Sequence, residues 1–190
     1  MTGPGGAVGD GPGGAGWDAR PGPGDLAPFY RRYTALVPDG DLLATLRAQG
    51  AETAALLRAH PGAAAHAYAP GKWTAAEVVA HVVDTERIFG ARALRLGRGD
   101  RTPLPGFDQD PYVAALDLAG RTLADLAGEF ERLRASTLDL LASVPRPALD
   151  AAGTVSGGPM TARAAAWVVA GHERHHVRIL RERYLPGGAA

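Results

Sequence analysis

The sequence predicts an all-α protein, a four-helix bundle, and three observations carry this prediction. Apolar residues recur every three or four positions in four long segments, which is the spacing of a buried helix face. No segment alternates apolar and polar residues convincingly over the length of a strand. Two connections rich in glycine and proline, residues 97–110 and 148–160, separate the later segments. Helices without a sheet bury their apolar faces against one another, in an antiparallel or mixed bundle.

The first 27 residues predict a disordered tail before a bundle domain that covers residues 28–186. Ten glycines and four prolines fall within residues 1–24, where apolar side chains such as Val8 and Trp17 are few. Such a composition offers little apolar area to bury. The tail lacks the continuous apolar run of a secretory signal, and no later run is long enough to span a membrane. We therefore expect a cytoplasmic protein with no membrane partner.

The first two helices of the bundle are expected on either side of a connection rich in alanine, glycine and proline. The first covers residues 39–59 and ends at a Pro-Gly pair. The second starts at Thr74, which forms a capping box with Glu77 three residues later. His60 and His66 lie at the end of the first helix and in the connection, and we expect both to be solvated.

The third and fourth helices are expected at residues 111–144 and 161–184. The third has a regular apolar stripe, although Gly120 and Gly128 each weaken it by about 1 kcal/mol relative to alanine. Two prolines just beyond its end stop it. Thr161 is placed to cap the fourth helix.

Charge and cysteine content restrict the function. The 20 basic and 20 acidic residues cancel, which argues against binding nucleic acid through bulk electrostatics. The chain has no cysteine, so it has no disulfide, no thiolate ligand and no cysteine nucleophile. A metal ion must therefore be held by histidine and carboxylate, and any thiol used in a reaction must come from outside the chain.

Histidines lie on the apolar stripes of two predicted helices. His172 and His176 are one turn apart, about 40° around the helix, so both imidazoles can reach one metal ion. His81 shares the stripe of Val78 and Val82 on the second helix. In a bundle, His81 could complete a site begun by the other two. The alternative is that these are core histidines satisfied by ordinary hydrogen bonds.

Two acidic residues follow His81 closely. Asp84 comes at i+3, near enough to orient an imidazole, accept a proton or approach the open side of a bound metal, and we predict a catalytic role for it. Glu86 is expected on a charged helix flank, where it would pair with Arg87 and Arg92.

The segment from His172 to His176 also fits the metalloprotease pattern H-E-x-x-H. A protease would need a third ligand further along, yet the 14 residues after His176 contain no histidine or aspartate. No sheet is predicted to form a substrate cleft. We therefore reject this interpretation and expect Glu173 on the helix flank, with His175 beside the site or solvated rather than a fourth ligand.

Several motifs together resemble the DinB-like superfamily, which includes the YfiT-like proteins. They are the Lys-Trp-Thr start at residues 72–74, residues 77–86 with their central histidine, and the Gly-His-Glu-Arg-His-His segment at 171–176. Residues 86–113 resemble one branch of the superfamily. The resemblance covers residues 28–185, with the motifs in matching order and spacing.

This resemblance implies an up-down-down-up bundle that holds one divalent metal ion. Carried over by position, the ligands are His81, His172 and His176. The family includes transferases that use low-molecular-weight thiols and a mycothiol-dependent isomerase, and its members commonly form homodimers. Three imidazoles suit zinc or nickel.

Two hypotheses follow, from different functional classes. The first is an enzyme in which the metal activates an external small thiol for transfer to an electrophile, with a hydrolase that uses metal-bound water as the runner-up. The second is a metal-binding module of the stress response that catalyses nothing. A bundle whose inward histidines bind no ligand is a third possibility.

Overall fold

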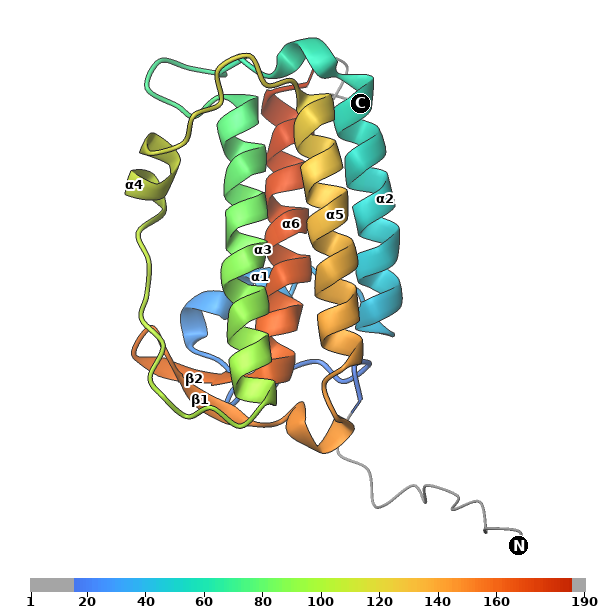
Figure 1. The fold of residues 1–190 in the computed structure, drawn as a ribbon, viewed down its shortest axis with the longest axis vertical. Helices are drawn as coiled ribbons and strands as arrows, with labels where there is room; N and C mark the ends of the chain where they lie inside the picture. Colours follow the sequence, from blue (N-terminus) through green and yellow to red (C-terminus); the bar gives the residue numbers. More distant parts are fainter. Residues whose placement is uncertain (1–15, 186–190) are drawn as a thin grey trace, which may run out of the picture.

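The computed structural model describes residues 16–185, and the disorder predicted for residues 1–15 lies outside the described residues. Four long helices form the body: α2 (Leu42–Ala59), α3 (Ala75–Gly97), α5 (Leu123–Ala142) and α6 (Ala162–Arg183). In Figure 1, α2 and α6 run upward, and α3 and α5 run downward. The expected all-α bundle with up-down-down-up topology is confirmed.

The four helices close around a common core. α3 packs against α5 and α6, and α2 packs against the same two helices from the other side. Short elements decorate the bundle: η1 (Pro28–Tyr30), α1 (Arg31–Thr34), η2 (Pro61–Ala63), α4 (Gln109–Ala114), η3 (Arg146–Ala148), β1 (Ala152–Val155) and β2 (Gly158–Thr161). No helix within residues 16–185 is long and apolar enough to cross a membrane.

Side-chain caps fix where the long helices begin. Thr74 and Glu77 form the predicted capping box at the start of α3, and Thr161 accepts a hydrogen bond from the backbone N–H of Ala164 at the start of α6. Asp41 caps α2 in the same way. Because these caps satisfy backbone donors that have no partner within the helix, they set the helix boundaries within a residue or two.

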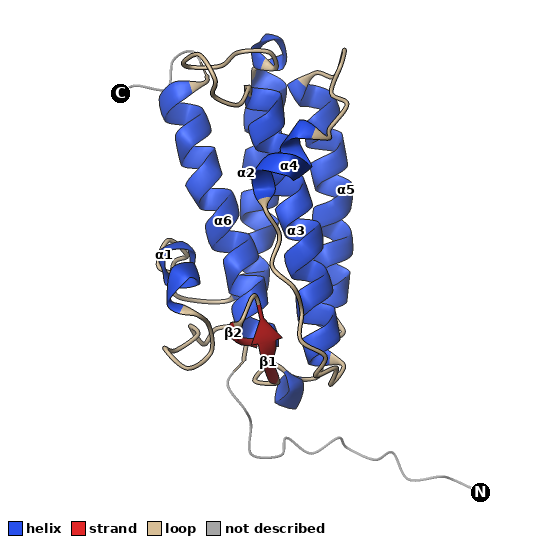
Figure 2. Ribbon diagram, turned by 90° about the vertical axis from the view of Figure 1, so that its left-hand side faces the viewer, coloured by secondary structure: helices blue, strands red, loops and turns tan. Residues whose placement is uncertain are grey.

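The predicted third helix at residues 111–144 is wrong, because two helices occupy this stretch. α4 ends at Ala114, and α5 begins only at Leu123. Gly120 takes a left-handed conformation with φ +72°, and Thr122 then forms a new capping box with Asp125. Apolar residues keep their spacing across the break, so periodicity alone does not reveal it. The crossover from α3 to α5 climbs one side of the bundle and carries α4, which packs on α3 (Figure 2).

A short hairpin precedes α6, where no strand was predicted. β1 and β2 pair antiparallel through four residues each, and Ser156 and Gly157 make the turn with positive φ angles of 51° and 79°. Isolated bridges connect Leu26 to Met160 and Leu104 to Val155. The hairpin thereby fastens the N-terminal segment and the crossover to the lower end of the bundle.

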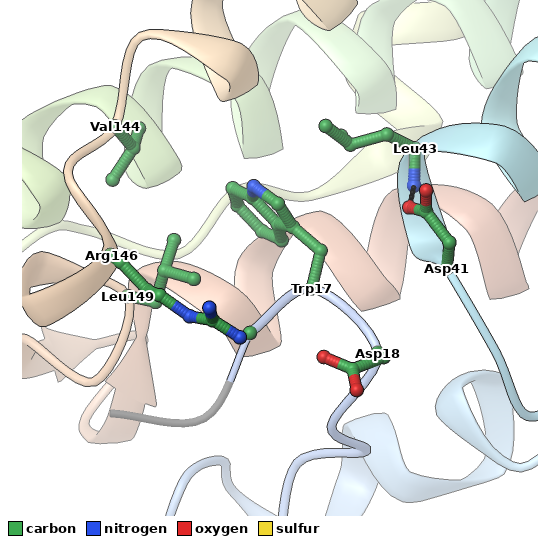
Figure 3. A pocket seen from close by; sticks show the side chains of 8 residues that line it. Trp17, Asp18, Asp41, Leu43, Val144, Arg146 and Leu149 are labelled. Atoms are coloured by element: carbon green, nitrogen blue, oxygen red, sulfur yellow. Dashed lines mark hydrogen bonds between the residues drawn. The ribbon is translucent and has the colours of Figure 1, made fainter. Parts of the chain in front are cut away.

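The predicted boundary at residue 27 is also wrong, because residues 16–27 pack on the bundle. Trp17 lies against the core beside Leu43 and Leu149, at a cavity of about 430 Å³ (Figure 3). Arg20 donates hydrogen bonds to two backbone carbonyls and stacks over the Trp167 ring at 4.9 Å. Leu26 is 1% exposed. A few well-placed side chains hold this segment despite its glycine-rich composition.

Candidate metal centre

The structure brings together the three histidines that the sequence predicts as ligands. His81 projects from α3, and His172 and His176 project from α6. One ring nitrogen of each lies within 4.8 Å of the others, and Nε2 of His81 is 3.1 Å from Nε2 of His172. His81 is 3% exposed and His172 is 5% exposed, while His176 is half-buried. We call these three residues the histidine triad.

Burial keeps the triad uncharged. Loss of solvation lowers the pKa of His81 to about 4 and the pKa of His176 to about 3. Burial, followed by repulsion from the neighbouring imidazoles, lowers the pKa of His172 well below its ordinary value. Near neutral pH all three rings are therefore neutral, which is the form that binds metal.

The triad fits a divalent cation. A neutral imidazole has one nitrogen without a proton, so each of the three rings can direct a lone pair to the point where the ring nitrogens converge. Within residues 16–185, no carboxylate hydrogen-bonds to any of the three rings. Neutral nitrogen ligands that converge without other partners suit zinc or nickel.

Aromatic side chains enclose the triad from two directions. The Trp73 ring is 5.1 Å from the His81 ring, and the Tyr33 ring is 5.3 Å from the His172 ring. His175 contacts Tyr33 at 5.6 Å, outside the converging nitrogens. Gly171 makes this arrangement possible, because a Cβ there would lie 2.0 Å from the carbonyl oxygen of Tyr33. The glycine thus lets α1 approach α6 beside His172.

Two cavities reach the triad from different sides. The first, which we call the Phe107 cavity, has a volume of about 590 Å³ and includes His81 and His172 in its wall. The second, the Trp73 cavity, has a volume of about 520 Å³ and includes His176. Gln109 and Asp110, in the first turn of α4, line both cavities. α4 therefore covers the point where the two cavities approach the triad.

Asp84, the residue predicted to be catalytic, takes part in an ion pair. Its carboxylate accepts a hydrogen bond from Nη1 of Arg87 at 2.9 Å, and Arg87 also pairs with Glu129 of α5. Asp84 lines neither of the two cavities. Its negative charge, followed by that of Asp110, favours protonation of His81. The catalytic role of Asp84 stays a prediction.

Asp110 was missed by the sequence reasoning, although it is the carboxylate that lines both cavities. Its position depends on how the crossover folds back over α3, and no local pattern encodes that path. The only available signal was its place in residues 86–113, the segment that resembles one branch of the family.

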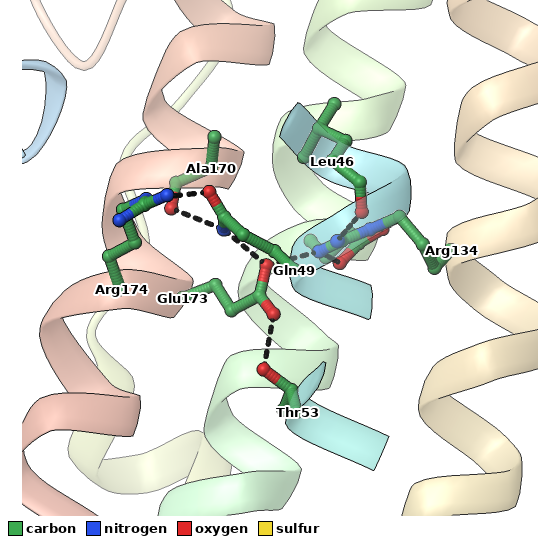
Figure 4. Close-up of polar contacts among 8 residues, drawn as sticks. Leu46, Gln49, Thr53, Arg134, Ala170, Glu173 and Arg174 are labelled. Carbon is green, nitrogen blue, oxygen red and sulfur yellow. Dashed lines mark hydrogen bonds and ion pairs between the residues drawn. The ribbon is translucent and has the colours of Figure 1, made fainter. Parts of the chain in front are cut away.

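The flank positions predicted for Glu86 and Glu173 are wrong. Glu86 is 2% exposed and Glu173 is 1% exposed, and both carboxylates bind Arg134 of α5. Arg134 donates to Glu86 at 2.9 and 2.7 Å and to Glu173 at 2.9 Å. Thr53 and Gln49 of α2 donate to Glu173 at 2.6 and 2.7 Å (Figure 4). We call these five residues the Arg134 network.

This network determines the orientation of Glu173. The residue follows His172 directly, yet its carboxylate points toward α2 and α5 and is held by three side chains (Figure 4). A metalloprotease glutamate must instead reach the water on the metal. The geometry agrees with rejecting the protease interpretation.

Comparison with known proteins identifies the family. Residues 44–180 match the family model of the DinB superfamily. The chain belongs to the DinB superfamily. The match spans α3 to α5, most of α2 and all but the last three residues of α6, and so includes the whole histidine triad. The resemblance seen in the sequence motifs is thereby confirmed.

A solved structure with a similar fold is known. YfiT from Bacillus subtilis, described as a probable metal-dependent hydrolase with an unusual four-helix bundle topology, superimposes with a TM-score of 0.56 at 16% identity. The alignment covers 87% of this chain and 91% of YfiT. No curated protein matches the chain. At this identity the likeness concerns the fold alone.

Proposed function

We propose that this protein is a metal-dependent transferase that activates a small thiol for attack on an electrophile. One observation carries the proposal: three neutral imidazoles converge between two cavities, so two small molecules can approach the same point from different sides. Two approaches suit a transfer between two substrates, whereas a hydrolase needs room for one substrate and a water molecule.

The chain's own residues supply binding and proton transfer. The histidine triad would hold a zinc or nickel ion, which lowers the pKa of a thiol or water bound to it. Asp110, at the junction of the cavities, is placed to accept the thiol proton, and Asp84 is the second candidate. Because the chain has no cysteine, the thiol must be a separate molecule.

A hydrolase is the alternative, and the description of YfiT as a probable metal-dependent hydrolase favours it. Water would then replace the thiol, and Asp110 would serve as its base. We further propose that the protein works in the cytoplasm as a homodimer on small molecules rather than on nucleic acid or membranes. If the metal-loaded protein proved inactive, we would conclude that it binds metal in the stress response without catalysing a reaction.

The proposal is tested by metal content and thiol transfer in protein purified without a histidine tag. We expect close to one zinc or nickel ion per chain, and transfer of a small thiol to monochlorobimane that a chelator abolishes. Replacing any triad member with alanine should lower metal occupancy at least about tenfold, because each supplies a third of the ligands. His60→Ala is the matched control, since His60 bonds the carbonyl of Leu56 and is not among the triad's converging nitrogens.

Two outcomes would contradict this function. Full thiol transfer by metal-free protein would refute the metal mechanism. Metal-loaded protein that is inactive with a panel of small thiols, yet hydrolyses an ester or an amide, would establish the alternative.

A further inference from the structure

Arg92 of α3 is a buried cation without a carboxylate. It is 4% exposed, and two other arginines of the described chain, Arg134 and Arg163, are also buried. Arg134 pairs with two carboxylates, and Arg163 pairs with Asp150. Within residues 16–185, no acidic side chain pairs with Arg92. An uncompensated buried charge is costly, so a buried arginine of this kind points to an anion supplied from elsewhere.

The surroundings of Arg92 form one end of the Phe107 cavity. Its Nη2 atom donates to the Pro105 carbonyl at 2.9 Å and to Ser156 Oγ at 3.3 Å, while Nη1 has no partner among the described residues. The guanidinium lies 4.6 Å from the Phe89 ring and 5.8 Å from the Phe107 ring. Both rings and Ser156 line the cavity, so Arg92 lies directly behind its wall.

Two hydroxyl groups stand between Arg92 and the cavity. The Tyr30 hydroxyl lies 3.3 Å from Ser156 Oγ, and both side chains line the cavity. Tyr30 donates its proton to Ser156, so Ser156 can donate its own proton to a group inside the cavity, while the positive charge of Arg92 lies behind it. Burial, which opposes the charge, lowers the pKa of Arg92, while Tyr30 favours the charged form.

The same helix face leads from this end to the histidine triad. His81, Thr85, Phe89 and Arg92 follow one another along α3 at intervals of three or four residues. The Cα atoms of His81 and Arg92 are therefore about 16 Å apart at 1.5 Å per residue. Between them, the buried Thr85 Oγ1 has no hydrogen-bond partner among the described residues and lines the cavity. A molecule in the cavity can thus reach the triad with one end and the Arg92 end with the other.

We propose that the Phe107 cavity binds the electrophilic substrate, and that this substrate is a carboxylate with an apolar or aromatic body. Its carboxylate accepts a hydrogen bond from Ser156, and a second one from Tyr30 once that hydroxyl turns away from Ser156, and Arg92 compensates its charge. Its body lies between the Phe89 and Phe107 rings, and its reactive group lies at the triad. Only one part of this proposal rests on the proposed function, namely the placement of the reactive group at the triad.

The charges around the cavity favour a carboxylate at this end. A carboxylate carries a single negative charge, which matches the one guanidinium, whereas a phosphate would bring up to two. Asp108 and Asp110 line the cavity at the first turn of α4, where they repel an anion. Arg32 also lines the cavity, but it is solvent-exposed and stacks 4.0 Å from the Phe29 ring.

Binding of 4-phenylbutyrate and of its uncharged amide tests the proposal, by calorimetry on metal-free and on metal-loaded protein. We expect the acid to bind about tenfold more tightly than the amide in both forms, since a hydrogen-bonded charge pair contributes this much or more. Arg92→Met should remove the preference, and Arg92→Lys should retain part of it. Arg32→Met, which removes the arginine that lines the cavity, should leave the preference intact.

Each failure has a distinct meaning. Equal binding of acid and amide to the natural chain overturns the proposal, whether or not Arg92→Met folds. A preference seen only with metal bound, or lost in Arg32→Met and kept in Arg92→Met, also overturns it, because the carboxylate then binds the metal or Arg32. Since the metal-free protein is measured as well, loss of metal-dependent activity would contradict the proposed function without affecting this result.

Discussion

Two neighbouring residues of α6, His172 and Glu173, lie in two buried polar regions that differ in their hydrogen bonding. His172 faces the histidine triad, and Glu173 faces the Arg134 network. Both side chains are at most 5% exposed, so burial does not distinguish them. They differ in what surrounds them: Glu173 has three donors on its carboxylate, whereas the triad nitrogens have no partners beyond one another among the described residues.

The Arg134 network is a closed site. Two carboxylates face one guanidinium, and the bonds join all four long helices, since Arg134 also donates to the Leu46 carbonyl at 2.8 Å (Figure 4). Although burial disfavours its charge, Glu173 and Glu86 raise the pKa of Arg134. Such a network stabilises one arrangement of the helices and leaves no hydrogen-bonding group free to bind a ligand. The triad is uncharged and bordered by two cavities, and this contrast supports our proposal that it is the functional site.

Arg134→Met should have the largest effect of the changes considered for these two regions. Removing the guanidinium leaves Glu86 and Glu173 buried without compensation, and breaking a buried pair in this way costs about 3–5 kcal/mol. The free energy of unfolding, measured by urea denaturation at pH 7.5, checks this. Combining Arg134→Met with Glu86→Gln and Glu173→Gln should recover much of the loss, because no charge then stays buried.

An exposed arginine of the bundle provides the control. Arg58 forms a two-pronged pair with Glu131 on the surface, and Arg58→Met should change the unfolding free energy little. If both arginine variants proved equally stable, the Arg134 network would not be the structural centre that its bonding indicates.

Acid should weaken the metal-free protein through the triad. Burial lowers the pKa of His81 to about 4, below its value in the unfolded chain, so the unfolded state binds the proton first as the pH falls. Stability from neutral His81 is therefore complete above about pH 6.5 and declines toward pH 4, by about 3 kcal/mol in total. Chemical denaturation in the presence of a chelator, at several values between pH 7.5 and 4, measures this decline.

The comparison variant is His81→Gln, which cannot take up a proton. It should remove the share of the decline that comes from His81, while His172 and His176, whose pKa values are also lowered, keep theirs. His60→Ala should leave the decline unchanged. An unaltered slope in His81→Gln would mean that His81 does not contribute to the acid sensitivity.

The sequence predicted what depends on local chemistry. The capping box at Thr74, the cap at Thr161 and the helical periodicity placed three of the four long helices within three residues at each end. His81, His172 and His176 could be grouped from the sequence alone, because each lies on the inward stripe of its helix and the family motifs coincide with them. The left-handed Gly120, which separates α4 from α5, interrupts no stripe and was therefore missed.

Interactions between distant segments escaped prediction. Glu86 and Glu173 look like flank residues until α5 brings Arg134 between them. Residues 16–27 have the composition of a disordered tail, yet Trp17, Arg20 and Leu26 find partners on the bundle and hairpin. In both cases the partner lies far along the chain, and a single sequence does not show which distant residues come into contact.

Replacing the two acidic residues near the triad, Asp84 and Asp110, should have the smallest effect on stability. It is also the most direct test of which residue accepts the proton. Asp84→Asn removes a partly exposed pair with Arg87, which contributes less than about 1 kcal/mol. Asp110 is exposed in the first turn of α4, and its replacement by asparagine should hardly alter the free energy of unfolding.

We expect thiol transfer to fall at least about tenfold in Asp110→Asn, with metal content unchanged, since a general base contributes about a hundredfold or more. Asp84→Asn should lower thiol transfer as well, but by less than Asp110→Asn, because Arg87 already binds the Asp84 carboxylate. The opposite ranking would restore Asp84 as the proton acceptor and show that the ion pair opens when substrate binds, and equal activity of both variants would mean that neither carboxylate takes the proton.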